Sequence, residues 1–471
     1  MAQDIQTLVV LMLENRAFDH MLGFLKRTNP AVDGLTGTEW NPSNPLAPAD
    51  HVAVSPTAQR VLDPDPGHTV EDTNVQLFSR QGGPPAAGPS NAGFIWSYSQ
   101  QKPAPSDPTS IMRCFDPGTL PVLTTLATQF AICDAWFSSV PGPTWPNRFF
   151  AHAATSKGYI TNSLFNNYDM ATVFERLAAH GRTWRIYYHD FAQSWALHGL
   201  QTPANRTRFS TFGRFKTDAR DGALPNYAFI EPKYFSFFGE ANDQHPPHDM
   251  QAGERLIAEV YEALRTSPQW RTSMLVILYD EHGGTYDHVL PPAAVPPDDH
   301  TSQFGFDRYG VRVPAVIVSP FVPAGPVHTT FDHTSIPATI SAIFGLPGFL
   351  TARDAAANRF DVLATLTSPR TDVPDLSAPA SGRSAATRPK RKAALGATVT
   401  SSTTTRGLSD FQQDLVELAR SLERRHGFVS ARALTDATRP RTERTAALYV
   451  RRVAAQMTRP TTTPRARRRR K

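Results

Sequence analysis

A threonine in a proline-stiffened turn is the first candidate for chemistry in this sequence. Thr144 follows the run Pro141–Pro143, which disfavours regular structure. Pro146 lies where the first turn of a helix tolerates proline, and residues 149–154 have a helical composition. Thr144 is therefore expected at or near the start of a helix, where free N–H groups and the helix dipole could bind a phosphate group. The alternative is a threonine that only caps its own helix.

Two pairs of polar side chains follow apolar runs that lie far apart in the sequence. Glu14-Asn15 comes directly after residues 7–13, and Asp280-Glu281 after residues 274–279. Such oxygen ligands suit one divalent cation, for which calcium, magnesium and manganese are all candidates. The expected metal ligands are Glu14, Asn15, Asp280, Glu281 and the Thr144 hydroxyl. The metal would lower the pKa of this hydroxyl, and the alkoxide would attack phosphorus to give a phospho-threonine intermediate. The alternative is that the acids are only charges at helix starts.

Histidines supply further candidate groups. His68 ends the segment Asp63-Pro-Asp-Pro-Gly-His68, and His245 and His248 lie in Asn242-Asp-Gln-His-Pro-Pro-His-Asp249. A histidine can donate to a phosphoryl oxygen and protonate a leaving alkoxide. For each histidine taken alone, the alternative is an ordinary surface or capping group.

Hydrophobic patterning predicts the elements that must position these residues. Continuous apolar runs rich in branched residues predict strands buried on both faces, as in a parallel sheet: Thr7–Leu13, Met274–Tyr279 and Val313–Val318. Helical patterns lie between them: Leu120–Gln129, Met170–His180 and Met250–Arg265. The alternation predicts an α/β fold with helices on both faces of a mostly parallel sheet. Both polar pairs would then follow carboxyl ends of strands, where sites form in such sheets.

The rest of the chain divides by composition. We expect a catalytic domain over residues 1–374, a flexible linker over 375–406, a helical region over 407–457 and a basic disordered tail over 458–471. Within the first, residues 28–110 lack clear periodicity and predict long ordered loops over the sheet edge. In the helical region, Ser409-Asp-Phe-Gln412 has capping-box spacing, and a second helix is predicted over Arg441–Met457.

Composition excludes several classes of protein. The chain has 471 residues, of which 40% are hydrophobic and 19% charged, as in ordinary globular proteins. Two cysteines, Cys114 and Cys133, are too few for a disulfide framework. The N-terminus has neither a basic region nor a long apolar stretch, so no signal peptide or membrane span is predicted. A cytoplasmic or peripheral membrane location is expected.

Several motifs together resemble the phosphoesterase family, which includes bacterial phosphatidylcholine-type phospholipases C, plant non-specific phospholipases C and certain acid phosphatases. The resemblance is strongest to the non-specific phospholipases C. It spans roughly residues 5 to 370, with the motifs in the same order. The segments are Glu14-Asn-Arg-Ala-Phe-Asp-His20, Asp63-Pro-Asp-Pro-Gly-His68, Pro143-Thr-Trp-Pro-Asn-Arg148, Asn242-Asp-Gln-His-Pro-Pro-His-Asp249 and Tyr279-Asp-Glu-His-Gly-Gly-Thr-Tyr-Asp-His-Val289.

The resemblance implies an alkaline-phosphatase-like α/β sandwich and a metal-centred site. It also implies that His68 and His245 contact the phosphoryl group, with His189 as a further catalytic histidine. Trp145 departs from the family pattern, in which glutamine is common at this position, and could alter the pocket. The residues expected to bind substrate are Asn147, Arg148 and His248; the alternative for the first two is that they only hold the turn.

The function implied is that of a phospholipase C, which hydrolyses glycerophospholipids to diacylglycerol and a phosphorylated head group. In the expected path, the metal and His68 stabilise the phosphoryl oxygens and His245 protonates the diacylglycerol oxygen. The alternative is an acid phosphatase that acts on soluble phosphomonoesters at the same site. A lipase needs an apolar surface beside its pocket, for which Phe235-Ser-Phe-Phe238 is a candidate unless it belongs to the core.

A strongly basic C-terminal part adds a question about partners. From Ser381 onward the chain has 22 Lys and Arg against 6 Asp and Glu, a formal charge of +16, whereas the preceding residues carry −10. Such a tail could hold the protein at an anionic membrane, or it could be a solvated extension. Nucleic acid is not an expected partner, because the tail lacks interleaved aromatic residues.

Overall fold

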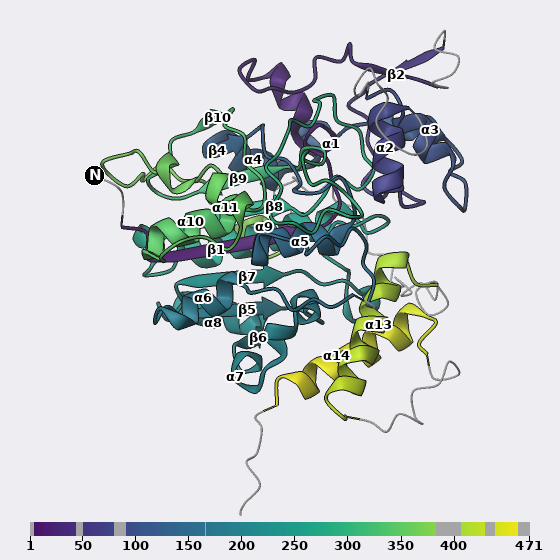
Figure 1. The fold of residues 1–471 in the computed structure, drawn as a ribbon. Coiled ribbons are helices and arrows are strands. Elements are labelled where there is room, and N and C mark those ends of the chain that lie inside the picture. The colour runs from purple at the N-terminus through teal and green to yellow at the C-terminus, as the bar shows by residue number, and fades with distance from the viewer. Residues whose placement is uncertain are drawn as a thin grey trace, which may run out of the picture.

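An eight-stranded sheet runs through the centre of the protein (Figure 1). The computed structural model describes residues 4–43, 50–79, 91–164, 166–382, 407–428 and 439–459. The strands of the sheet are β1 (Thr7–Leu13), β4 (Ala131–Cys133), β5 (Trp184–Tyr188), β6 (Phe209–Thr211), β7 (Tyr227–Glu231), β8 (Ser273–Tyr279), β9 (Ala315–Val318) and β10 (Gly325–Val327). Their order is β10-β4-β9-β8-β1-β7-β5-β6, and β2 (Trp40–Pro42) and β3 (His51–Ala53) form a separate hairpin.

The central strands place the two polar pairs side by side. β1 pairs in parallel with β7 and with β8, and Leu13 is opposite Tyr279 in the β1–β8 register. Because the two strands run in the same direction, Glu14 and Asp280 leave the sheet at the same end. β9 runs antiparallel to both β8 and β4, whereas the remaining pairs are parallel. The predicted α/β fold with a mostly parallel sheet is confirmed.

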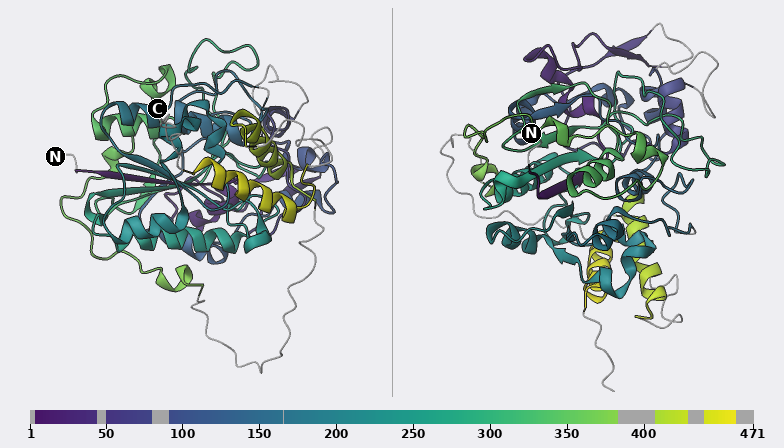
Figure 2. Two further views of the ribbon diagram at one scale, coloured as in Figure 1. Left: turned by 90° about the horizontal axis from the view of Figure 1, so that it is seen from below. Right: turned by 60° about the vertical axis from the view of Figure 1, so that its left-hand side comes forward.

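Helices cover both faces of the sheet (Figure 2). One layer contains α4 (Pro121–Gln129), α8 (Phe212–Arg220), α9 (Met250–Arg265) and α12 (Ser377–Ala380), with α9 in contact with the other three. The other contains α5 (Thr144–Ala153), α6 (Val173–Ala179) and α10 (Ser335–Phe344). The remaining helices are α1 (Phe18–Leu22), α2 (Val70–Phe78), α3 (Phe94–Ser99), α7 (Pro203–Arg206), α11 (Ala352–Ala356), α13 (Asp410–Arg425) and α14 (Glu443–Met457).

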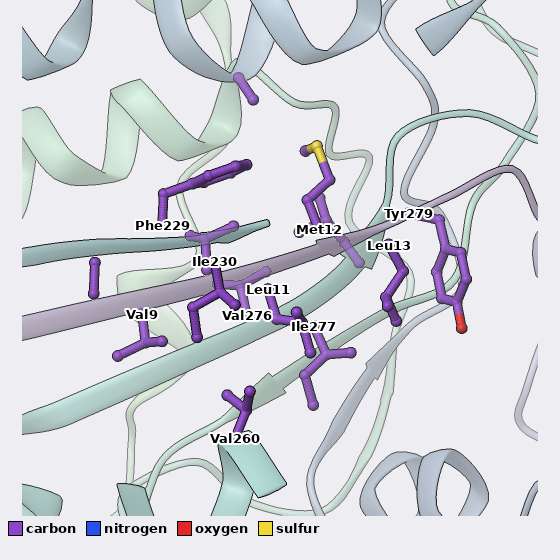
Figure 3. Close-up of a cluster of buried hydrophobic side chains, with 14 of the residues drawn as sticks. Val9, Leu11, Met12, Leu13, Phe229, Ile230, Val260, Val276, Ile277 and Tyr279 are labelled. Carbon is purple, nitrogen blue, oxygen red and sulfur yellow. The ribbon is translucent and has the colours of Figure 1, made fainter. Parts of the chain in front are cut away.

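The core lies on both sides of the central strands, which explains their unbroken apolar sequences. Every residue of β1 and of β8 is buried. Figure 3 shows Met12 and Phe229 on one face, and Leu11 and Ile277 on the face where Val260 of α9 lies. A strand packed on two sides needs apolar side chains at consecutive positions rather than alternate ones.

The structure corrects the interpretation of residues 28–110 as loops alone. The described part of this segment contains the helices α2 and α3 and the hairpin of β2 and β3. Their sequences are short and mix polar with apolar residues, so helical periodicity is hard to recognise. α2 begins with a complete capping box, in which Thr69 and Asp72 bond reciprocally.

The C-terminal helices lie against the body of the protein. Both predicted helices are confirmed as α13 and α14, and Ser409 forms the predicted capping box. Their apolar residues belong to the same hydrophobic core as the sheet. Residues 375–382, at the start of the predicted linker, contain α12 and pack on α9, where the Leu376 N–H donates to Glu262 Oε1 at 2.7 Å. The rest of that linker and residues 460–471 lie outside the described residues. None of the described helices is long and apolar enough to cross a membrane.

Candidate active site

The carboxyl ends of β1 and β8 bring the polar pairs together. The Asn15 N–H donates to Asp280 Oδ1 at 3.1 Å, and so does the Glu281 N–H at 2.9 Å. Asn15 has a φ of 52°, a left-handed conformation that asparagine tolerates better than most residues. Gly283 packs so closely on Asn15 that a Cβ atom there would lie 2.4 Å from the Asn15 carbonyl oxygen. The turns after both strands are thus locked to each other.

Thr144 is the first residue of α5 and faces this cluster. Its hydroxyl donates to Glu14 Oε2 at 3.5 Å, its only hydrogen bond within the described part of the chain. The hydroxyl is therefore directed at the strand end and does not cap its own helix. The neighbouring Trp145 is buried in the core and contacts Tyr168 edge to face.

Asn147 holds the turn that presents Thr144. Its Nδ2 donates to the carbonyl oxygens of Val140, Gly142 and Pro143, and its Oδ1 accepts the Val140 N–H. This amide is fully used within the turn, which supports the positioning alternative over a contact with substrate.

Arg148 bridges the ends of β1 and β8. Its Nη2 lies 2.6 Å from Glu14 Oε1, and its Nε lies 3.2 Å from Asp280 Oδ2. The guanidinium also donates to the carbonyl oxygens of Met12 and Leu13. The side chain is almost completely buried by these contacts. Arg148 thus lies as a buried counter-charge between two carboxylates.

The carboxylates are crowded and incompletely neutralised. Burial raises the pKa of Glu14 well above its usual value, against the opposing charge of Arg148, and Asp280 raises it further. Burial likewise raises the pKa of Glu281 to about 8, despite the nearby charge of His68. Arg148 pairs with Glu14 and Asp280, and His68 lies near Glu281, so three buried acids face two basic groups and the cluster attracts a further positive charge.

The donor atoms fit a hard divalent cation. Asn15 Oδ1 and Glu281 Oε1 are buried and have no hydrogen-bond partner among the described residues. Glu14 Oε2 accepts the long 3.5 Å bond from the Thr144 hydroxyl. An unpartnered buried oxygen is costly, and a cation coordinated by oxygen ligands would remove that cost. Asp280 is the least available ligand, because both of its oxygens accept hydrogen bonds.

Two histidines face the cluster from its solvent side. His68 Nε2 lies 4.0 Å from Glu281 Oε1 and 3.5 Å from Asn15 Nδ2. The ring of His245 lies 6.0 Å from that of His68, and its Nε2 lies 3.8 Å from Asp65 Oδ2. Burial opposes protonation of His68, but the charge of Glu281, the bond to the Pro66 carbonyl oxygen and the charges of Asp72 and Asp280 together raise its pKa. Burial, followed by the charge of His68, lowers the pKa of His245 well below its usual value. Of the two rings, His68 is therefore the one that binds a proton more readily.

The other predicted histidines have different surroundings. His248 Nδ1 lies 2.6 Å from Asp243 Oδ1, close to His245 in the same loop. His189 Nδ1 lies 2.9 Å from the Glu231 carbonyl oxygen, and its ring stacks on Phe212. Burial lowers the pKa of His189 to about 4, so it is neutral at pH 7. Within the part of the chain that the structure describes, its contacts lie on β7 and α8 and not on Glu14 or Thr144.

Two further residues support the site. Gln193 Nε2 donates to Glu14 Oε1 at 2.6 Å. His333 binds the Asp280 carbonyl oxygen through Nε2 at 2.5 Å and accepts from Trp136 through Nδ1. The segment Phe331-Asp-His-Thr-Ser335 distinguishes His333 in the sequence. Sequence reasoning missed Gln193, which lies in a segment with no distinguishing pattern.

Helix α13 is the least expected contributor. Phe411 stacks on the His245 ring with 5.2 Å between centroids and 10° between planes. Asp414 Oδ2 accepts from Asn162 Nδ2 at 3.0 Å, and Asn162 Oδ1 accepts the Trp145 N–H at 2.9 Å. The helix thus contacts one candidate catalytic histidine and, through Asn162, the residue next to Thr144.

Access to solvent lies on the side of the histidines. Glu14, Asn15 and Thr144 are completely buried, whereas the side chains of His68 and Asp65 are 18% and 23% exposed. A cavity of about 350 Å³ does not include these residues; it is lined by residues of the segments 329–338 and 349–363. A phosphate group would therefore approach Thr144 past His68.

Asp414 gives a pH-dependent test of this arrangement. Burial raises the pKa of Asp414 to about 7, although the bond from Asn162 lowers it. In the unfolded chain the pKa of an aspartate is near 4. The proton on Asp414 therefore stabilises the folded state fully below pH 4, and this stabilisation is lost as the pH rises through 7. Asp414→Asn keeps an oxygen for Asn162 but cannot ionise. Its Tm relative to the unmutated protein should rise between pH 5.5 and pH 8.5.

The matched control is Asp299→Asn, which changes an exposed carboxylate. Its Tm difference should be the same at both pH values when measured by circular dichroism. If the Tm difference between Asp414→Asn and the unmutated protein is the same at pH 5.5 and pH 8.5, the raised pKa of Asp414 is contradicted.

Comparisons with known proteins identify the family of the chain. The model of the Phosphoesterase family matches residues 5–347, so the chain belongs to this family of phosphoric ester hydrolases. Non-specific phospholipase C3 of Arabidopsis thaliana is 39% identical over 90% of this chain and 84% of its own length. Non-specific phospholipase C6 of the same plant is 41% identical, over 90% and 81%. The crystal structure of a protein in the alkaline phosphatase superfamily from Vibrio parahaemolyticus covers 52% of this chain and 66% of its own, at 11% identity and a TM-score of 0.31.

Proposed function

We propose that the protein is a phospholipase C that cleaves glycerophospholipids on the glycerol side of phosphate through a phospho-threonine intermediate. The observation that carries the proposal is the Thr144 hydroxyl, which is buried at the start of α5 and donates to Glu14 at the joint end of β1 and β8. The similarity to non-specific phospholipases C over most of both chains supports the lipid substrate.

In the proposed reaction, Thr144 Oγ1 attacks phosphorus and the bond to the glycerol oxygen breaks. Glu14 Oε2 is the group bonded to the Thr144 hydroxyl and can accept its proton. His68, whose pKa is raised, is placed to donate to the phosphoryl oxygens. His245 is neutral in the free site and gains a proton only once a negative phosphodiester raises its pKa. It then protonates diacylglycerol, and water hydrolyses the phospho-threonine.

A divalent cation would be held by Glu14, Asn15, Glu281 and the Thr144 hydroxyl, with Asp280 behind them. When bound, it would lower the pKa of the hydroxyl and offset phosphate charge.

The function is tested by incubating the purified protein with phosphatidylcholine vesicles and, separately, with a soluble phosphomonoester. Diacylglycerol and phosphocholine are the expected products. Inorganic phosphate from the monoester, without lipid cleavage, would instead identify an acid phosphatase and overturn the proposal.

Removal of metal should destabilise the protein. A ligand that binds only the folded state at about 100 times its Kd adds about 2.7 kcal/mol to the free energy of unfolding. Exhaustive chelation should therefore lower Tm and abolish turnover, and one of calcium, magnesium or manganese should restore both.

Glu281→Gln is the matched variant, because it keeps the side-chain shape and removes a ligand charge. Its Tm should respond weakly to the restoring metal. If chelation changes neither the Tm nor the turnover of the unmutated protein, the proposal that it holds a divalent cation is contradicted.

A further inference from the structure

An exposed surface of aromatic and basic residues lies beside the active site. It is formed by the 3₁₀ turn η6 (Ser236–Phe238) and by α14. Phe238 is 47% exposed and Leu448 of α14 is 48% exposed. Part of the predicted apolar segment is core, since Phe235 is buried. We call the set Phe237, Phe238, Arg444, Leu448 and Arg451 the Arg–Phe patch.

The patch is fixed in its exposed position. The Ser236 N–H donates to Glu443 Oε1 at 2.5 Å, which ties η6 to the first turn of α14. The guanidinium carbon of Arg444 lies 5.2 Å from the centroid of Phe237, and that of Arg451 lies 4.2 Å from the centroid of Phe238. Cation–π contacts of this kind hold a ring and a charge together. Phe238 is thus kept at the surface with an arginine on its face.

The exposed charges of this surface are positive. The exposed basic residues on and beside α14 are Arg441, Arg444, Arg451, Arg452 and Arg459. The only acid in α14 is Glu443, which is buried under η6. Arg452 pairs with Glu423, whereas Arg444 and Arg451 form no ion pair within the described residues. Six further basic residues follow between positions 465 and 471 of the sequence.

The patch lies on the side of the protein where substrate enters. η6 is part of the loop that leads from β7 to His245. α13 and α14 pack against each other (Figure 2, left), and Phe411 of α13 stacks on His245. One loop and one helix pair therefore carry both the patch and a wall of the active site.

We propose that the Arg–Phe patch docks the protein on an anionic phospholipid bilayer. Phe238 and Leu448 enter the lipid interface, and Arg444 and Arg451 bind lipid phosphates. Charge complementarity favours this occupant, because an exposed arginine near an anionic bilayer is strongly attracted and amphipathic surfaces insert apolar side chains between head groups. The proposal rests on lipid hydrolysis as the function, but docking can be measured without turnover.

The test measures binding of the full chain to sedimented vesicles of pure phosphatidylcholine or of phosphatidylcholine with one-third phosphatidylglycerol. Binding should be tighter to the anionic vesicles and should weaken with salt. The double variant Arg444→Glu and Arg451→Glu should bind them at least about 30-fold more weakly. Phe238→Ala should weaken binding roughly fivefold at any salt concentration.

The matched control reverses two exposed arginines at the opposite end of the sheet, Arg220 at the end of α8 and Arg271 just before β8. This pair should bind as the unmutated protein does. The proposal would be overturned if both double variants lost vesicle binding equally, or if the patch variant bound the anionic vesicles as tightly as the unmutated protein. Displacement from vesicles by duplex DNA, with the same dependence on Arg444 and Arg451, would overturn it in favour of a nucleic-acid surface.

A soluble short-chain substrate separates docking from catalysis. The patch variant should cleave it at a rate within twofold of the unmutated protein, while its rate on anionic vesicles falls with binding. If the unmutated protein binds vesicles but cleaves no lipid, the proposed function fails and the docking surface stands. If the patch variant cleaves anionic vesicles at the unmutated rate, the docking surface fails and the function stands.

Discussion

Thr144→Ala is expected to lower kcat on phosphatidylcholine by at least about 1,000-fold, because a nucleophile cannot be replaced by its neighbours. The substitution removes one buried hydroxyl, whose only hydrogen bond within the described residues is the 3.5 Å contact with Glu14. The fold should therefore be retained, with a Tm close to that of the unmutated protein. Initial rates of diacylglycerol release measure the effect.

Thr144→Ser is the matched variant, since it keeps the hydroxyl and removes only a methyl group. It should retain measurable turnover and form an acid-stable phosphoryl adduct when quenched during the reaction. Turnover of Thr144→Ala within tenfold of the unmutated protein would show that the nucleophile lies elsewhere.

Arg148→Met is expected to lower the free energy of unfolding by about 3–5 kcal/mol, because it leaves buried carboxylates without their counter-charge. Arg148 is held between Glu14 and Asp280 and is itself almost completely buried. The loss should be largest near pH 8 and smaller near pH 5, where Glu14, whose pKa is already raised, takes up a proton. Urea unfolding at the two pH values measures it.

Arg148→Lys keeps the charge but cannot bridge two carboxylates with one planar group. It should be intermediate in stability. If Arg148→Met unfolds at the same urea concentration as the unmutated protein, the contacts of Arg148 with the two carboxylates do not contribute to stability. A role of Arg148 in binding substrate would then be favoured.

The longest apolar segments of the sequence were sufficient to predict the centre of the fold. β1 and β8 coincide with two unbroken branched runs, and α9 spans the predicted Met250–Arg265. A strand buried on both faces leaves a strong signal because consecutive residues must be apolar. β5 and β6 are short strands on one side of the sheet and include Arg185 and Ser210, so their patterns are weak.

The candidate site was predictable where chemistry depends on residue type, and not where it depends on packing. Two acids after parallel strands must meet if the strands are neighbours, and the register of β1 with β8 makes them so. The orientation of Arg148 depends on how α5 crosses the strand ends, and no local pattern encodes that crossing. The contact between Phe411 and His245 joins residues 166 positions apart in the sequence.

The position of α13 also sets an order of events during synthesis. Every strand of the sheet has left the ribosome before Phe411 and Asp414 are made. At roughly 5–20 residues per second, a short interval follows in which the sheet can form while His245 lacks its aromatic neighbour and the Thr144 turn lacks its link through Asn162. The nascent protein is thus incomplete at the catalytic end until its final helices dock.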